Sequence, residues 1–224
     1  MEKLIEKINN SQYIELETTE KNLFVTSALY TYILTLHKKV SFVMDTKEIE
    51  RKYTFLPWIE KIKTSHSKSA DVVLNIDIEI TECIKYFYEQ KLKINQKMAT
   101  ALYGGLVEYT NGFQNAKTNG MVFAYAKILL EANADNHIVN NFILREKSLG
   151  YMRFHGYMLE NMLLCNDATQ AHFTITQDIL KQYGVVMENV YEIMQEAFRL
   201  PYIKESILLD RENKILKLYK RKNS

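Results

Sequence analysis

The sequence contains little glycine, proline and cysteine for its length. Only seven Gly and two Pro occur in 224 residues, which excludes a linker-rich chain and predicts mostly regular structure. The two cysteines, Cys83 and Cys165, lie far apart and without CxxC spacing, so we predict free thiols in a reducing compartment. The net charge of +2 is close to neutral and neither requires nor excludes a nucleic-acid partner.

Long apolar segments are also missing. No uncharged apolar run approaches the roughly 18 residues that a membrane-spanning helix needs. The first eight residues, MEKLIEKI, include acidic side chains and no apolar core of signal-peptide length. We therefore expect a cytoplasmic protein with no membrane partner.

Several common catalytic and nucleotide-binding motifs are absent. The sequence has no GxxxxGK[ST], GxGxxG, HExxH or GxSxG pattern. The histidines occur singly, without the spacing of metal ligands, and we expect His37 and His137 on helix surfaces. The five are His37, His66, His137, His155 and His172.

The hydrophobic pattern of the first 80 residues predicts a parallel sheet. Apolar residues recur at helical spacing near the N-terminus and over 25–38, whereas short β-branched or apolar runs alternate with them. The predicted strands are 13–16, 40–44 and 71–77. This order of strand, helix and strand is typical of an α/β fold.

The remaining sequence predicts a helical middle and a second α/β module. We expect helices over 81–92, 96–108, 119–132 and 138–164. Gly104 and Gly105 lie in the second of these, where close packing against a neighbour or a nearby ligand would explain them equally well. A strand over 172–176, helices over 177–183 and 187–199, and a hairpin of 203–209 with 215–219 follow. The pattern changes near residues 156–170, so we predict domains of 1–158 and 159–224.

Four stretches, in order, resemble the DHH phosphoesterase superfamily, specifically its RecJ-like and nanoRNase branch. They are Ser27–Tyr30 with Leu36–Val40, Arg51–Trp58 (RKYTFLPW), Ala70–Asp77 (ADVVLNID), and Ala99–Leu106 (ATALYGGL) with Thr110 and Phe113. The resemblance implies a parallel-sheet DHH-like N-terminal domain with a helical middle. It also implies a truncated, smaller α/β C-terminal module. The family hydrolyses phosphoesters with manganese.

The family's metal ligands are largely absent from the matching positions. Glu17, Lys21 and Leu23 stand where the family has its His-x3-Asp-x-Asp pattern, and Tyr109 stands at a later aspartate. The Asp-His-His motif is missing, and Asp77 is the retained carboxylate. An ammonium group cannot ligate a divalent cation, and leucine has no donor atom. The resemblance thus implies a degenerate site with no catalytic residue, no metal and no cofactor.

The C-terminal strand also resembles the family's substrate-binding module. Lys217–Arg221 matches a strand that carries a phosphate-binding arginine, and Arg221 takes that position. The family's glycine-rich loop is missing after it, so an Arg221–phosphate contact would lack backbone donors. The main interpretation of this basic tail is therefore a solvated strand face, and phosphate binding is the alternative.

Three functions follow from these observations. The first is a catalytically inactive protein that binds, regulates or assembles an unidentified protein partner, and a homodimer is compatible with it because a shortened module leaves apolar surface uncovered. The second is weak binding of a nucleotide or short oligonucleotide, with Arg221 on phosphate and Tyr109 stacked on a base. The third is a residual metal-dependent phosphoesterase that uses Asp77, Glu79, Glu108 and Glu17.

Overall fold

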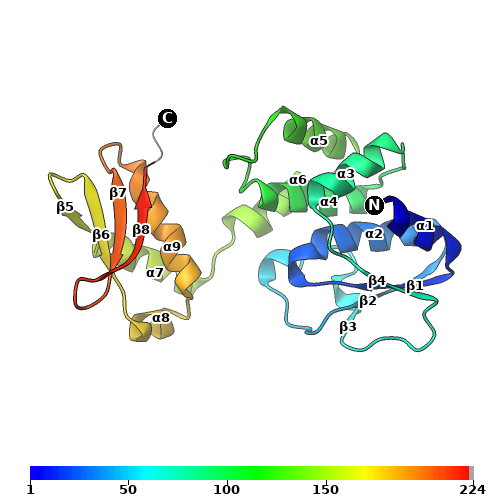
Figure 1. Ribbon diagram of the computed structural model, residues 1–224, viewed down its shortest axis with the longest axis horizontal. Helices are drawn as coiled ribbons and strands as arrows, with labels where there is room; N and C mark the ends of the chain where they lie inside the picture. The colour runs from blue at the N-terminus through cyan, green and yellow to red at the C-terminus, as the bar shows by residue number, and fades with distance from the viewer. Residues whose placement is uncertain (222–224) are drawn as a thin grey trace. The chain divides into compact units, whose positions relative to one another are not determined.

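The protein consists of two compact units, each with its own hydrophobic core (Figure 1). The computed structural model describes residues 1–221, and the first unit ends at Glu146. No helix within the described residues is long and apolar enough to cross a membrane.

The first unit is built on a four-stranded parallel sheet of order β3-β2-β1-β4. The chain runs through α1 (Glu2–Asn10), β1 (Tyr13–Glu17), α2 (Leu23–Thr35), β2 (Lys39–Val43), β3 (Ile62–Lys63) and β4 (Val72–Asn75). It builds outward from β1 to β3 and then returns to place β4 on the other side of β1. The strand order therefore reverses between β1 and β4, where ligands bind in open α/β sheets.

The two faces of this sheet differ in chemistry because β1 alternates. Ile14 and Leu16 are fully buried in the core beside α1 and α2, which lie on one side of the sheet (Figure 1). Glu15 points to the other side and is also fully buried. Its carboxylate contacts His66 Nδ1 at 2.7 Å and accepts a hydrogen bond from the backbone N–H of Ser67 at 2.9 Å. A polar loop thus covers the centre of this face, whereas helices usually cover both faces of a parallel sheet.

The helical middle of the first unit comprises α3 (Ile80–Glu89), α4 (Gln96–Tyr109), α5 (Gly120–Glu131) and α6 (Asn136–Asn140). Helix α4 packs closely against α2, and this packing is the explanation of the glycine pair that the structure supports. A Cβ atom added at Gly105 would lie 2.6 Å from Cδ1 of Ile80 and 2.9 Å from Cβ of Phe24. Glycine is required there because nothing larger fits without a shift of its neighbours.

The single helix predicted over 138–164 is wrong. Helix α6 continues as a π-helical turn, Asn141–Arg145, and the chain then becomes extended at Glu146. Helix α7 (Leu149–Glu160) starts anew at Ser148, whose Oγ accepts a hydrogen bond from the N–H of Tyr151 at 3.0 Å. Strand β5 (Leu163–Cys165) follows. The hydrophobic spacing continued through this break, but the serine cap begins a new helix.

Because of this break, the units divide between residues 146 and 147, earlier than the boundary predicted after residue 158. The apolar side of α7, with Tyr151, Phe154 and Met158, is buried in the core of the second unit. His37, expected on a helix surface, instead lies in the turn after α2 with a φ of 57°.

The second unit is a mixed four-stranded sheet of order β5-β6-β7-β8. After α7 and β5 come β6 (Gln170–Thr174), α8 (Gln177–Tyr183), α9 (Met187–Glu196), β7 (Glu205–Leu209) and β8 (Ile215–Lys220). Strands β6 and β7 are parallel, and β7 and β8 form the predicted antiparallel hairpin. Ser206 Oγ donates to the carbonyl of Met194, which joins β7 to α9 at 2.8 Å. The observed class is therefore the predicted one, a parallel-sheet α/β unit with a helical middle and a smaller α/β module.

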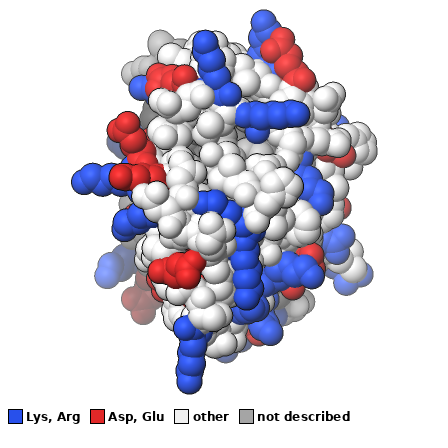
Figure 2. All heavy atoms as spheres, turned by 90° about the vertical axis from the view of Figure 1, so that its right-hand side faces the viewer, with Lys and Arg blue, Asp and Glu red and all other residues white. Residues whose placement is uncertain are grey.

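The surface carries charges of both signs. Figure 2 shows basic side chains spread over one face with acidic side chains among them. The charges on this face are therefore mixed, and the sequence as a whole has a net charge of only +2.

Candidate functional site

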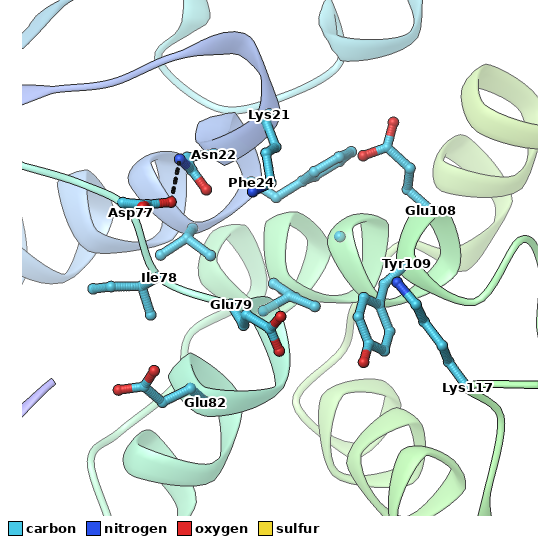
Figure 3. A pocket seen from close by; sticks show the side chains of 13 residues that line it. Lys21, Asn22, Phe24, Asp77, Ile78, Glu79, Glu82, Glu108, Tyr109 and Lys117 are labelled. Carbon is cyan, nitrogen blue, oxygen red and sulfur yellow. Dashed lines mark hydrogen bonds between the residues drawn. The ribbon is translucent and has the colours of Figure 1, made fainter.

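A pocket of about 440 Å³ lies in the first unit, next to the carboxyl ends of β1 and β4 (Figure 3). The start of α2, the segment after β4, the start of α3 and the end of α4 provide its walls. The lining residues are Lys21, Asn22, Phe24, Val25, Asp77, Ile78, Glu79, Ile80, Glu82, Gly105, Glu108, Tyr109 and Lys117. This position agrees with the strand-order reversal between β1 and β4.

Three carboxylates form the acidic side of the pocket. Asp77 follows β4 and is exposed, and its Oδ1 lies 3.5 Å from Nδ2 of Asn22. Glu79 directly precedes α3, and Glu82 lies in the first turn of that helix. Glu82 accepts a hydrogen bond from the α-amino group of Met1 at 3.2 Å. Asp77 and Glu79 are therefore the carboxylates of this wall that have no ion pair in the described residues.

Glu108 lines the same pocket, but its carboxylate is already bound by two other side chains. Its carboxylate accepts from Nζ of Lys52 at 3.0 Å and from the hydroxyl of Tyr53 at 3.2 Å. Burial alone would lower the pKa of Lys52, but the hydrogen bond and the charge of Glu108 raise that pKa above its usual range. Burial and the Glu108 charge raise the pKa of Tyr53 as well. These partners neutralise Glu108 and fix its orientation.

The basic and aromatic side of the pocket combines Lys21, Tyr109 and Lys117. Lys21 belongs to a short 3₁₀ turn, Glu20–Asn22, and its side chain is exposed. Tyr109 ends α4, and Nζ of Lys117 lies 4.1 Å from the centre of its ring. This is a cation–π contact, so one face of the Tyr109 ring is already covered.

The structure brings together three of the five residues predicted from the sequence. Asp77, Lys21 and Tyr109 all line the pocket. Leu23 does not, because its side chain is fully buried in the core as the first residue of α2. Glu17 ends β1 and does not line the pocket; its Oε1 lies 3.8 Å from Nε2 of His66.

The residues of this site do not fit a two-metal centre. Such a centre needs several anionic or imidazole ligands around the ions. Within residues 1–221, no three Asp, Glu, His or Cys side chains converge as a group that could hold a metal ion. The proposed set of Asp77, Glu79, Glu108 and Glu17 is divided, because Glu108 binds Lys52 and Glu17 lies outside the pocket.

Arg221 lies in the second unit and has a structural environment. Its Nε donates to the carbonyl of Ile203 at 2.7 Å, and its Nη2 donates to the carbonyls of Phe198 and Leu200 at 2.6 and 2.7 Å. The guanidinium also lies over the Phe198 ring, 5.6 Å from its centre. Backbone carbonyls thus occupy Nε and Nη2 of the guanidinium that was predicted to contact phosphate.

Sequence reasoning missed Lys117 and Glu82 as pocket residues. Lys117 lies in the loop between α4 and α5, so no helical or strand periodicity predicts that it lies near Lys21. Glu82 follows Glu79 by three residues, and both lie at the start of α3, one directly before the helix and one in its first turn. That spacing was the available signal for Glu82, and Lys117 had none.

No protein-family model and no curated protein matches this sequence. Among solved structures, the chain is similar to an exopolyphosphatase-related protein from Bacteroides fragilis, with a TM-score of 0.69 and 12% identity. The match covers 93% of this chain and 78% of that chain. A Methanococcus jannaschii protein assigned to the family II inorganic pyrophosphatases matches at a TM-score of 0.30 and 11% identity, over 89% of this chain and 83% of that one. That second score is too low to support an argument. The first likeness shows that this chain shares the fold of that exopolyphosphatase-related protein and, at this identity, the fold alone.

Proposed function

We propose that this chain is a catalytically inactive relative of the DHH phosphoesterases, of the RecJ-like and nanoRNase branch, that acts in the cytoplasm by binding a protein partner. The observation that carries the proposal is the chemistry at the start of α2. Leu23 is buried in the core, and the Lys21 ammonium lines the pocket where a hydrolase of this fold would hold metal ions. A cation at that position repels divalent ions, and Asp77 and Glu79, the two carboxylates of the wall without an ion pair within residues 1–221, are too few to hold a two-metal centre.

Metal binding and hydrolysis test this proposal directly. The purified chain is titrated with Mn²⁺ by calorimetry and incubated with Mn²⁺ and di- to tetranucleotides. We expect neither stoichiometric binding at micromolar metal nor release of mononucleotide. Manganese-dependent hydrolysis that Asp77→Asn abolishes would overturn the proposal and restore the residual-phosphoesterase hypothesis. Glu89→Gln, at the far end of α3, is the matched carboxylate control.

Binding of a nucleotide without cleavage is the second candidate, and one observation favours it. Lys21, Lys117 and Tyr109 line the same pocket, so two ammonium groups and an aromatic ring are available to one ligand. Because the Arg221 guanidinium bonds to backbone carbonyls, these lysines replace it as the phosphate-binding residues. Asp77 and Glu79 weaken such binding by repelling phosphate.

Fluorescence anisotropy of labelled di- and tetranucleotides tests this second candidate. Binding at low salt that falls steeply with added salt and is lost in a Lys21→Ala, Lys117→Ala double variant would support it. Unchanged anisotropy at low salt and high protein concentration would eliminate it. Lys127→Ala with Lys93→Ala is the control, because neither lysine lines the pocket.

A further inference from the structure

Helix α5 is unusually apolar for a helix on the surface. Among its twelve residues only Lys127 and Glu131 are charged. A helix that is apolar all round is normally buried on all sides. Here Met121 and Phe123 are 60% and 56% exposed, and Leu130 is exposed as well. The outer side of α5 therefore exposes apolar surface of the kind that proteins usually bury in an interface.

The positions around the helix axis define a crest with two apolar flanks. The inner side consists of Val122, Tyr125, Ala126 and Leu129, which are buried. The opposite side, the crest, contains Gly120, Ala124, Lys127 and Glu131 by the 3.6-residue period. One flank of the crest carries Met121 and Ile128, and the other carries Phe123 and Leu130. Small residues thus occupy the first half of the crest and long charged residues the second half.

The charge at the C-terminal end of α5 is unfavourable for the helix dipole. The helix ends on a glutamate, its last turn has no basic residue and its first turn has no acidic one. A carboxylate at a helix C-terminus is unfavourable, whereas at a helix N-terminus it is stabilising. The intrahelical contact with Lys127, at 3.7 Å and exposed, compensates weakly. An antiparallel copy of the same helix would place Glu131 beside an N-terminus.

A hollow beside α5 provides space for side chains from such a copy. A cavity of about 220 Å³ lies between α3 and α5 and is lined by Lys85, Tyr88, Glu89, Met121, Ala124, Tyr125 and Ile128. Tyr88 is exposed on its α3 side. The lining is largely apolar, which suits an aliphatic or methionine side chain more than a polar ligand.

We propose that α5 forms a two-fold symmetric interface with a second copy of this chain, with the two helices antiparallel. In this register Ala124 lies opposite Lys127 of the second copy, and Gly120 lies opposite Glu131. Each long side chain then faces a small residue, and each Glu131 faces the N-terminus of the other helix. In an antiparallel pair the same flanks meet, so Phe123 contacts Leu130 of the second copy, and Met121 contacts Ile128 beside the hollow.

The second copy is favoured over an unrelated partner because one helix supplies both halves of the complementarity. Its large and small residues, its apolar flanks and its C-terminal glutamate with the N-terminus of the other copy match under a single two-fold rotation. This interface lies outside the catalytic-like pocket and stands whether or not the chain hydrolyses phosphoesters.

Sedimentation equilibrium of the full chain over a wide concentration range tests the interface. We expect a monomer–dimer equilibrium in the wild type and monomers for Ala124→Arg and Met121→Arg. Met152→Arg is the matched control, since Met152 is a 58% exposed methionine on α7 of the second unit. A wild type that stays monomeric at hundreds of micromolar, or a dimer that persists in both α5 variants, would overturn the inference.

Glu131→Lys provides a second readout that does not depend on a steric clash. It improves the charge at the end of its own helix but places an ammonium at the N-terminus of the other copy. We expect a folded chain whose dimer dissociation constant rises by about tenfold, since the contact occurs twice. An unchanged or tighter dimer would contradict the antiparallel register. Titration of the same samples with Mn²⁺ tests the proposed function independently. A failure of the dimer inference and a failure of the proposed function can therefore be distinguished.

Discussion

At the scale of single residues, the buried Glu15 is the most unusual group of the first unit. A fully buried carboxylate is costly unless it is paired and hydrogen-bonded. Burial by itself would raise the pKa of Glu15, but hydrogen bonds from the Ser67 N–H, His66 and Ser41 together hold that pKa below its usual range. Glu15 therefore fastens the loop that covers the polar face of the sheet.

This pairing predicts an acid-sensitive contribution to stability. Because the pKa of Glu15 is lower in the folded state, its contribution is complete above the ordinary glutamate range and is lost as the pH falls through the folded pKa. Glu15→Gln should cost about 1–3 kcal/mol at neutral pH and flatten the dependence below pH 5. Urea unfolding from pH 3 to 7 measures both. An unchanged pH profile in the variant would show that other carboxylates control acid unfolding.

The glycines provide a matched pair of substitutions with opposite signs. Gly105→Ala should lower the free energy of unfolding by about 1–3 kcal/mol, because its Cβ would overlap Ile80 and Phe24. Gly156→Ala, in α7, meets no atom within 4 Å and should raise it by up to about 1 kcal/mol. Thermal and chemical unfolding of both variants measures the difference. If the two substitutions changed the free energy of unfolding equally, α2 and α4 would be able to move apart at little cost and the close packing at Gly105 would not matter.

At the scale of elements, Arg221 acts as a cap. Its guanidinium satisfies carbonyls at the 3₁₀ turn Ala197–Arg199 and just before β7, which closes the end of the second unit. The sequence match suggested phosphate as the partner of this arginine. The match could not reveal the carbonyls that Arg221 binds, because they come from a segment about twenty residues earlier in the chain. Element packing, which the local sequence does not contain, decides its role.

Arg221→Ala should therefore destabilise the second unit rather than weaken a ligand. We expect a loss of about 1–3 kcal/mol, since three carbonyls lose a charged donor. Arg211→Ala, in the exposed turn between β7 and β8, should change stability by less than about 0.5 kcal/mol. Denaturant unfolding compares the two variants. Wild-type stability together with reduced oligonucleotide affinity in Arg221→Ala would restore the phosphate hypothesis.

At the scale of the whole molecule, the two cores predict two unfolding transitions. Each unit has its own cysteine, Cys83 in the first and Cys165 in the second, and neither forms a disulfide. Burial raises the pKa of the Cys83 thiol to about 12, so this group should not react with alkylating reagents while the first unit is folded. Cys165 is half-buried and should react in the native protein.

Pulsed alkylation along a urea gradient, followed by peptide mass analysis, measures the order of these events. We expect Cys83 labelling to follow the unfolding of the first unit, at a urea midpoint that differs from the midpoint of the total loss of helix signal, to which both units contribute. Cys83→Ala leaves Cys165 as the control reporter. A single midpoint for every probe would show that the units unfold as one cooperative body.

Some of this architecture was determined by the sequence alone. The strand over 13–16, the helices over 81–92, 96–108 and 119–132 and the hairpin around Asp210–Asn213 depend on local sequence patterns, and the structure confirms them. The absence of ligand chemistry at Lys21 and Leu23 is likewise a property of the residue types themselves, since no fold can make leucine a metal ligand.

The tertiary structure decided what depends on distant segments. It separated Glu17 from the pocket, paired Glu108 with Lys52, bound Arg221 to carbonyls and divided the predicted helix of 138–164 between two cores. Each outcome depends on which surfaces meet when apolar area is buried, and that choice is made by the whole chain. The exposed crest of α5 shows the same point, because the sequence shows an apolar helix and only the fold shows which side is left uncovered.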